Sequence, residues 1–367
     1  MSEFILPLKD LGMLLNAFYL NGSASFEVHS PHLACRLFSI KLEENKPGAR
    51  VTHILDRELY NTAYEETTRG DQMLLEEIPN FSYYRFIFLS SGMILPRNWE
   101  KLSAGIIDEL KRDPLKGQRA IFLSFDTNAL ITRYYHLISK SIRNNADRCG
   151  YVISSGVIDE LTKLDNKYSG NELSILNRSL KSHEAWDGFL NQQKLMSRKF
   201  KMGFIEFKLM TTREYFEKAE GETGDNSIIS ALEDYSQNKK VDVMVFSEDS
   251  DFIEKATARQ QLMGERLDAP VDLSQSVAGE WEDICELLYA ASIVYGNLQI
   301  KGAVKAKISG IWSGKKGESW NEEAVMVRTE NKDVVDFLER NVGILRRMEG
   351  LDKKACGECG HGLYCGD

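Results

Sequence analysis

Acidic side chains that could hold a metal ion follow two of the strands that the sequence predicts. Asp126 comes directly after the apolar run 120–125, and Asp249 and Asp251 follow the apolar run 241–246. Continuous apolar runs of this length are typical of parallel strands that helices cover on both faces. The carboxyl ends of parallel strands share one edge of the sheet, where ligands bind. We therefore expect these three acids to lie together, although over 120 residues separate the first from the others.

Two further acids occupy early positions of predicted helices. Glu160 lies in the first turns of a helix that follows the apolar run 151–153, with Ser154 or Ser155 as the expected N-cap. Asp225 opens another helix after Gly224, and apolar residues recur along one face of that helix. Helices that follow parallel strands begin at the same edge of the sheet. The sequence thus predicts that four or five carboxylates converge there.

Such a group of carboxylates needs a cation. Like charges raise one another's pKa unless a positive ion neutralises them, and Mg²⁺ and Mn²⁺ are the hard ions that prefer oxygen ligands. A bound ion of this kind lowers the pKa of a water molecule and neutralises charge that develops on a phosphate. This chemistry requires no histidine, and none of the six histidines falls in the four acidic segments.

The four acidic segments resemble, in order, those of the PIN-domain family of nucleases. The resemblance covers roughly residues 118–295 and is carried by these segments: Phe125-Asp-Thr-Asn-Ala-Leu, Val157-Ile-Asp-Glu-Leu, Gly224-Asp-Asn-Ser-Ile-Ile-Ser-Ala and Ser247-Glu-Asp-Ser-Asp-Phe.

The resemblance implies an α/β fold with a central parallel sheet and a metal-dependent nuclease, most often one that acts on RNA. It assigns the Mg²⁺ or Mn²⁺ ligands and catalytic residues to Asp126, Glu160, Asp225, Asp249 and Asp251, with Asn128 or Ser247 as supporting hydrogen-bonding residues.

Other interpretations remain open at this point. A single acid at a helix N-terminus is often only a cap or a partner of the helix dipole. A PIN fold could keep its acids and serve as a non-catalytic RNA-binding or regulatory scaffold. The same metal site could also cleave DNA, because metal ions act on the phosphate and not on the sugar.

Two basic segments could bind the substrate. Six basic and two acidic residues lie between Arg178 and Lys201, and Arg198 and Lys199 are candidate contacts to a phosphate backbone. This segment falls in the roughly sixty residues that separate Glu160 from Asp225. Its charges could equally form a solvated helix face.

The second basic segment is a predicted strand that carries Lys301, Lys305 and Lys307. With Trp312 and Trp320 nearby, these lysines could form a platform for nucleic acid. Lysines on an edge strand can instead protect a sheet against aggregation.

The last residues form a cluster of metal-ligating side chains. Cys356, Cys359, His361 and Cys365 lie within ten residues of one another, and three thiolates with one imidazole would satisfy a tetrahedral Zn²⁺. The alternative is a flexible tail with free or redox-active thiols.

Changes in periodicity divide the chain into four regions. We predict an α+β domain over residues 1–110, an α/β domain over 111–296, a small basic domain of strands and a closing helix over 297–350, and the tail over 351–367. In the first region we expect a helix over 8–18 and strands over 34–41 and 83–89. That region could select substrate, bind a protein partner or form a homo-oligomer.

Composition bears on location and on partners. The most apolar stretch, 84–95, is too short to span a bilayer, and the N-terminal residues lack a basic segment, so we expect a cytoplasmic protein without membrane contact. The net charge of −9 argues against nucleic-acid binding over the whole surface. Nucleic acid, RNA by the resemblance, would have to bind at local basic segments.

Overall fold

The parallel sheet of the protein contains the strands that the acidic residues follow. The computed structural model describes residues 2–44, 48–162, 168–180, 194–311 and 323–358, with side chains up to residue 348. Within these residues five parallel strands form a sheet in the order β7-β6-β5-β8-β9. The strands are β5 (Ile121–Phe125), β6 (Cys149–Ser154), β7 (Phe216–Ala219), β8 (Asp242–Ser247) and β9 (Leu262–Arg266). The α/β class and the three strands predicted over 120–125, 151–153 and 241–246 are confirmed.

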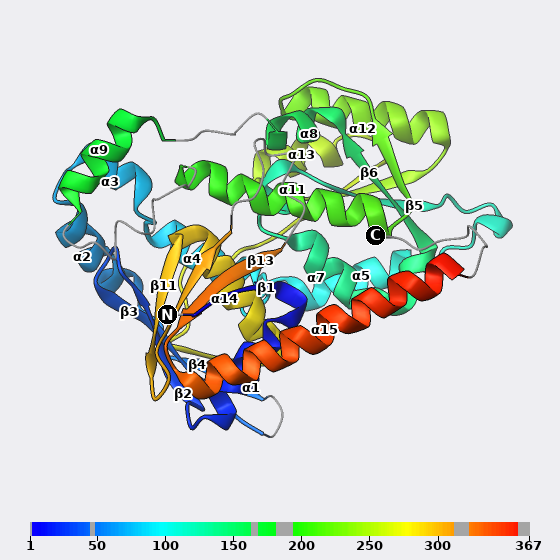
Figure 1. Ribbon diagram of the computed structural model, residues 1–367. Coiled ribbons are helices and arrows are strands. Elements are labelled where there is room, and N and C mark those ends of the chain that lie inside the picture. The colour runs from blue at the N-terminus through cyan, green and yellow to red at the C-terminus, as the bar shows by residue number, and fades with distance from the viewer. Residues whose placement is uncertain (1, 45–47, 163–167, 181–193, 312–322, 359–367) are drawn as a thin grey trace.

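Helices cover this sheet on both sides, as Figure 1 shows for α7 and α12. Every residue of β5 is buried, which explains why its sequence is an uninterrupted apolar run. The helical elements of this part of the chain are η2 (Pro114–Lys116), α6 (Thr127–Ile131), α7 (Tyr134–Ser141), η3 (Arg143–Arg148), α8 (Ser155–Thr162), α9 (Gly170–Ser179), α11 (Leu195–Arg213), α12 (Asp225–Lys239) and α13 (Ser250–Thr257).

A second, antiparallel sheet combines strands from the start and the end of the chain. Its order is β1-β13-β12-β11-β2-β3-β4-β10 among the described residues. The strands are β1 (Ser2–Pro7), β2 (Ser25–Ser30), β3 (Cys35–Leu42), β4 (Ala49–Thr52), β10 (Ser276–Gly279), β11 (Asn297–Gly302), β12 (Ala306–Gly310) and β13 (Ala324–Thr329).

This pairing corrects the predicted separation of residues 1–110 from residues 297–350. β1 pairs with β13 and β2 pairs with β11, so the two regions form one sheet. The alternation of apolar residues predicts which face of a strand is buried but not which strand lies beside it. The periodicity of the sequence therefore could not predict these pairings between the two ends of the chain.

The strand predicted over 83–89 is wrong, because these residues lie in helix α4 (Phe81–Ser90). The side chain of Asn80 caps this helix by accepting hydrogen bonds from the backbone N–H groups of Ser82 (3.0 Å) and Tyr83 (3.4 Å). Most residues of α4 from Tyr84 onward are buried. An apolar run that is buried on all sides has no period that separates a helix from a strand.

The basic segment over 300–308 also differs from its prediction as one strand. It forms parts of two strands, β11 and β12, that pair as an antiparallel hairpin. β12 also pairs with β13 on its other side.

Helix α14 (Trp281–Tyr295) packs against the antiparallel sheet and forms the centre of the core there. All twelve residues from Ile284 to Tyr295 are buried, and a helix that is apolar on every side belongs in an interior. It contacts β11, β12, α4 and α11. The other helical elements of this part are η1 (Leu8–Asp10), α1 (Gly12–Leu20), α2 (Arg57–Thr68), α3 (Gln72–Glu77), α5 (Trp99–Glu109) and α15 (Lys332–Glu358).

A buried ion network joins the two sheets. Arg133 precedes α7, is 1% exposed and contacts Glu206 of α11 (3.0 Å), Glu286 of α14 (2.5 Å) and Glu323 beside β13 (2.8 Å). Its guanidinium carbon also lies 5.5 Å from the ring centroid of Tyr289. One cation thus holds together segments from both sheets.

We expect Arg133→Met to lower the free energy of unfolding by roughly 3–5 kcal/mol, because it leaves three carboxylates without their buried cation. Urea denaturation measures the change. Arg143→Met, at an exposed arginine of η3, is the matched control and should change stability little. Equal stability of the two variants would contradict a structural role for the network.

The same network predicts a pH effect at Glu206. Burial raises the pKa of Glu206 to about 7, above its ordinary value, although Arg133 opposes the shift. The folded state therefore binds this proton more tightly than the unfolded state, and the stabilisation is lost as pH rises from about 4.5 through 7. In Glu206→Gln the fall in unfolding free energy between pH 5 and pH 8 should be smaller by roughly 2–3 kcal/mol. An unchanged pH dependence would contradict the raised pKa.

Candidate carboxylate site

Asp126 is fixed at the end of β5 by two hydrogen bonds. Its Oδ1 accepts a bond from the Ala129 backbone N–H (2.6 Å), which makes Asp126 the N-cap of α6. Its Oδ2 accepts a bond from the Ser247 hydroxyl (2.6 Å). The side chain is only 7% exposed, so both oxygens have defined positions.

Ser247, the last residue of β8, links Asp126 to Asp249. The backbone N–H of Asp249 donates to the Ser247 Oγ (3.0 Å), while the Ser247 hydroxyl donates to Asp126. Asp249 caps α13, since its Oδ1 accepts bonds from the N–H groups of Asp251 (2.8 Å) and Phe252 (3.3 Å). The expected supporting role of Ser247 thus has a geometric basis.

The strands that precede Asp126 and Asp249 have a particular place in the sheet. From β5 the chain continues through β6 and β7 on one side, whereas β8 and β9 lie on the other side of β5. β5 and β8 are adjacent strands at which the strand order reverses. In open parallel sheets the crevice for a ligand lies at the carboxyl ends of such strands. Asp126 and Asp249 flank that point.

The side chain of Glu160 links the acidic segment that precedes it in the sequence to the one that follows it. One of its carboxylate oxygens accepts a hydrogen bond from the Thr127 hydroxyl, next to Asp126. The other accepts a bond from the backbone N–H of Gly224 (3.2 Å), next to Asp225. Gly224 has a φ of +96°, a conformation that favours glycine. The structure therefore brings the second and third acidic segments to the same edge.

Asp225 and Asp251 are more open to solvent than Asp126. Both are exposed, and an oxygen of Asp225 lies 3.3 Å from the ammonium of Lys255 on α13. Within the described residues no three or more His, Cys, Asp or Glu side chains lie close enough to form a metal-binding group. The acids thus share one edge, linked in pairs through Ser247, Thr127 and Gly224, without a single cluster.

Burial dominates the electrostatics of Asp126. It raises the pKa of this carboxyl to about 7, the bonds from Ser247 and Ala129 oppose the shift, and the charges of Glu248 and Asp249 add to it. Glu248 was not singled out from the sequence. Its place between Ser247 and Asp249, in a segment at a strand end, was the signal that could have identified it.

The prediction that Arg198 and Lys199 contact substrate is not supported by their burial. Arg198 is 1% exposed. The Lys199 ammonium lies 5.0 Å from the ring centroid of Phe86 and 5.7 Å from that of Tyr83. Burial lowers the pKa of Lys199. The Lys199 ammonium thus packs against aromatic rings of α4. The sequence shows the charge of these two residues but not how their helix packs against another unit.

The remaining predicted residues lie beside Asp126, on the antiparallel sheet or outside the described residues. Asn128 is exposed on α6, two residues after Asp126. The three lysines Lys301, Lys305 and Lys307 belong to the antiparallel sheet and its hairpin. Cys356 lies in α15 beyond the described side chains, and Trp312, Trp320, Cys359, His361 and Cys365 lie outside the described residues. The zinc site therefore stays a prediction.

A scan against protein-family models found no match, and no curated protein matches the chain. In the described part of the chain, no helix has both the length and the apolar character needed to cross a membrane.

Close packing at Gly156 predicts that an added side chain would disturb the carboxylate edge of the parallel sheet. A Cβ atom at Gly156 would lie 2.1 Å from the carbonyl oxygen of Glu222, in the loop that leads to Gly224. Gly156→Ala should therefore displace this loop and lower the free energy of unfolding by about 1–3 kcal/mol. Gly170→Ala, where a Cβ would meet nothing within 4 Å, is the control and should be close to neutral. Thermal denaturation of both variants tests the claim, and equal melting temperatures would contradict it.

Proposed function

We propose that this protein is a metal-dependent nuclease that hydrolyses phosphodiester bonds, with RNA as the expected substrate. The observation that carries the proposal is the pair Asp126 and Asp249, linked through Ser247 at the carboxyl ends of two adjacent parallel strands where the strand order reverses. The resemblance of four ordered segments to PIN-domain nucleases supports the same class and the finer domain layout.

The donor chemistry of the edge fits Mg²⁺ or Mn²⁺. Asp126, Glu160, Asp225, Asp249 and Asp251 offer carboxylate oxygens, the ligands that these ions prefer. The raised pKa of the buried Asp126 indicates a carboxylate whose negative charge lacks compensation. A bound ion would activate water and neutralise the charge on the phosphate.

The chain's own residues prepare this edge. The Ser247 hydroxyl orients the carboxylate of Asp126, and the Thr127 hydroxyl orients that of Glu160. The Lys255 ammonium lies beside Asp225 and partly neutralises it. Asp126 and Asp249 would ligate the ion directly, while Glu160 would ligate it or position the attacking water.

The test is cleavage of labelled single-stranded RNA with Mg²⁺ or Mn²⁺. We expect cleavage by the wild-type protein, none in EDTA, and a loss of about 100-fold or more in Asp126→Asn with Asp249→Asn, since metal stabilisation of the transition state contributes several kcal/mol. Asp147→Asn with Asp234→Asn, at two exposed acids outside the edge, controls for the loss of charge. Single-stranded DNA in parallel reactions separates a ribonuclease from a DNA nuclease. Absence of cleavage of either polymer, or full activity of the first double variant, would refute the proposal.

A non-catalytic RNA-binding protein on the same scaffold is the second candidate. It is favoured by the ion pair of Asp225 with Lys255 and by the lack of a single carboxylate cluster within the described residues. It predicts RNA binding that is indifferent to the Asp→Asn changes and no cleavage with either ion. A cytoplasmic location and a homo-oligomer or protein partner at the N-terminal region remain predictions.

A further inference from the structure

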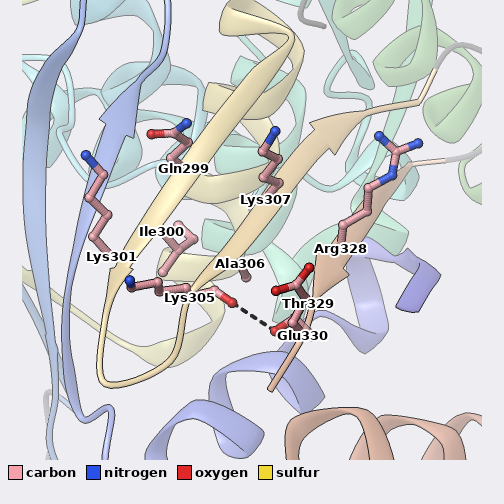
Figure 2. A pocket seen from close by; sticks show the side chains of 9 residues that line it. All are labelled: Gln299, Ile300, Lys301, Lys305, Ala306, Lys307, Arg328, Thr329 and Glu330. Carbon is pink, nitrogen blue, oxygen red and sulfur yellow. Dashed lines mark hydrogen bonds between the residues drawn. The ribbon is translucent and has the colours of Figure 1, made fainter. Parts of the chain in front are cut away.

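Basic side chains gather on the outward face of the antiparallel sheet. Lys301, Lys305, Lys307, Arg328 and the acidic Glu330 line a groove of about 400 Å³. Figure 2 shows Lys307 and Arg328 side by side on neighbouring strands, pointing the same way, with Lys305 near the end of the hairpin. The hydroxyl of Thr329 donates to the Lys305 carbonyl (2.8 Å) and fixes the hairpin against β13.

The register places like charges directly opposite each other. Lys307 is the cross-strand partner of Arg328, an arrangement that costs stability in a sheet. Glu3 compensates Arg328 through an ion pair of 2.8 Å. Lys301 and Lys305 are exposed, and their ammonium groups have no hydrogen bond or ion pair with any described residue.

Protection of a sheet edge does not explain these lysines. β11 and β12 are interior strands of the sheet, between β13 and β2, so Lys301 and Lys307 do not guard an open edge. A water-facing sheet needs only polar side chains of mixed charge. Here four cations line the groove with one acid, and Glu3 outside the lining compensates one of the four, on a chain whose net charge is −9.

The acid opposite Lys301 is already engaged with other cationic side chains. Glu27, the cross-strand partner of Lys301, contacts His29 (2.8 Å) and Arg36 (2.9 Å). These two contacts hold the pKa of Glu27 below its ordinary value. The groove therefore keeps a local excess of positive charge that an anionic ligand could neutralise.

We propose that this groove binds the phosphate backbone of a single-stranded nucleic acid. Its volume lies in the range of pockets for small molecules, so it has room for one or two nucleotides of a single strand. Among the described residues, its lining holds no aromatic side chain on which bases could stack, so we expect binding to depend on phosphate and salt and to show little preference for sequence. The proposal rests on the proposed function for the kind of polyanion, but it places binding on a different sheet from the carboxylate edge.

The test measures binding without cleavage. Fluorescence anisotropy of labelled single-stranded RNA, with EDTA present, compares the wild type with Lys301→Gln, Lys305→Gln and Lys307→Gln combined. We expect affinity to fall roughly 10- to 100-fold at 0.1 M salt and the salt slope to decrease by about 2, the value for three lost phosphate contacts. The double variant Lys301→Gln with Lys305→Gln changes only exposed side chains and should show an intermediate loss.

Lys140→Gln, Lys218→Gln and Lys239→Gln combined remove the same charge from exposed positions outside the antiparallel sheet. This control should bind as the wild type does. Equal losses in both triple variants, wild-type binding by the groove variants, equal affinity for an RNA duplex, or no binding by the wild type would each overturn the inference. Lysine-dependent binding in this assay, together with no cleavage in the separate reactions with Mg²⁺ or Mn²⁺, would support the groove and refute the nuclease.

Discussion

The buried contacts of Arg133 are the constraint on which the arrangement of the two sheets depends. A guanidinium with three carboxylates around it leaves an excess of negative charge, and burial raises the pKa of Glu206 and Glu323. Removing one member of such a network is costly, because the remaining charges cannot reach water. Each carboxylate comes from a different segment, so the network specifies how α7, α11, α14 and β13 meet.

Opposite charges of the molecule gather on separate sheets. The carboxylates line one edge of the parallel sheet, with Asp126 and Asp249 linked through Ser247. The excess of lysines lies on the outward face of the antiparallel sheet. A nuclease with this layout would hold its substrate at a basic face and cleave it at an acidic edge. The net charge of −9 therefore hides two local fields of opposite sign.

Several elements were predictable because their physical signal is local. Asp126 follows a strand whose residues are all buried, and an uninterrupted apolar run is the pattern that such a strand requires. The segment 83–89 shows the limit of that signal, because the same kind of run forms helix α4, where Asn80 supplies the cap. Arg198 and Lys199 show another limit, since their charges suggested contact with a phosphate backbone or a solvated face. Packing instead buries Arg198 and places the Lys199 ammonium over the ring of Phe86. Glu248 was missed because the motif that identified this segment consists of the residues on either side of it.

The sequence alone determined the acids at the ends of the parallel strands, since a strand's carboxyl end and the start of the next helix are set by adjacent residues. Tertiary structure alone decided which strands pair across the chain. β1 pairs with β13 and β2 pairs with β11 through backbone hydrogen bonds. Such bonds do not depend on the types of the side chains, so the sequence does not reveal them. It also decided that Lys301 and Lys307 lie on interior strands, because the position of a strand in a sheet depends on partners distant in sequence.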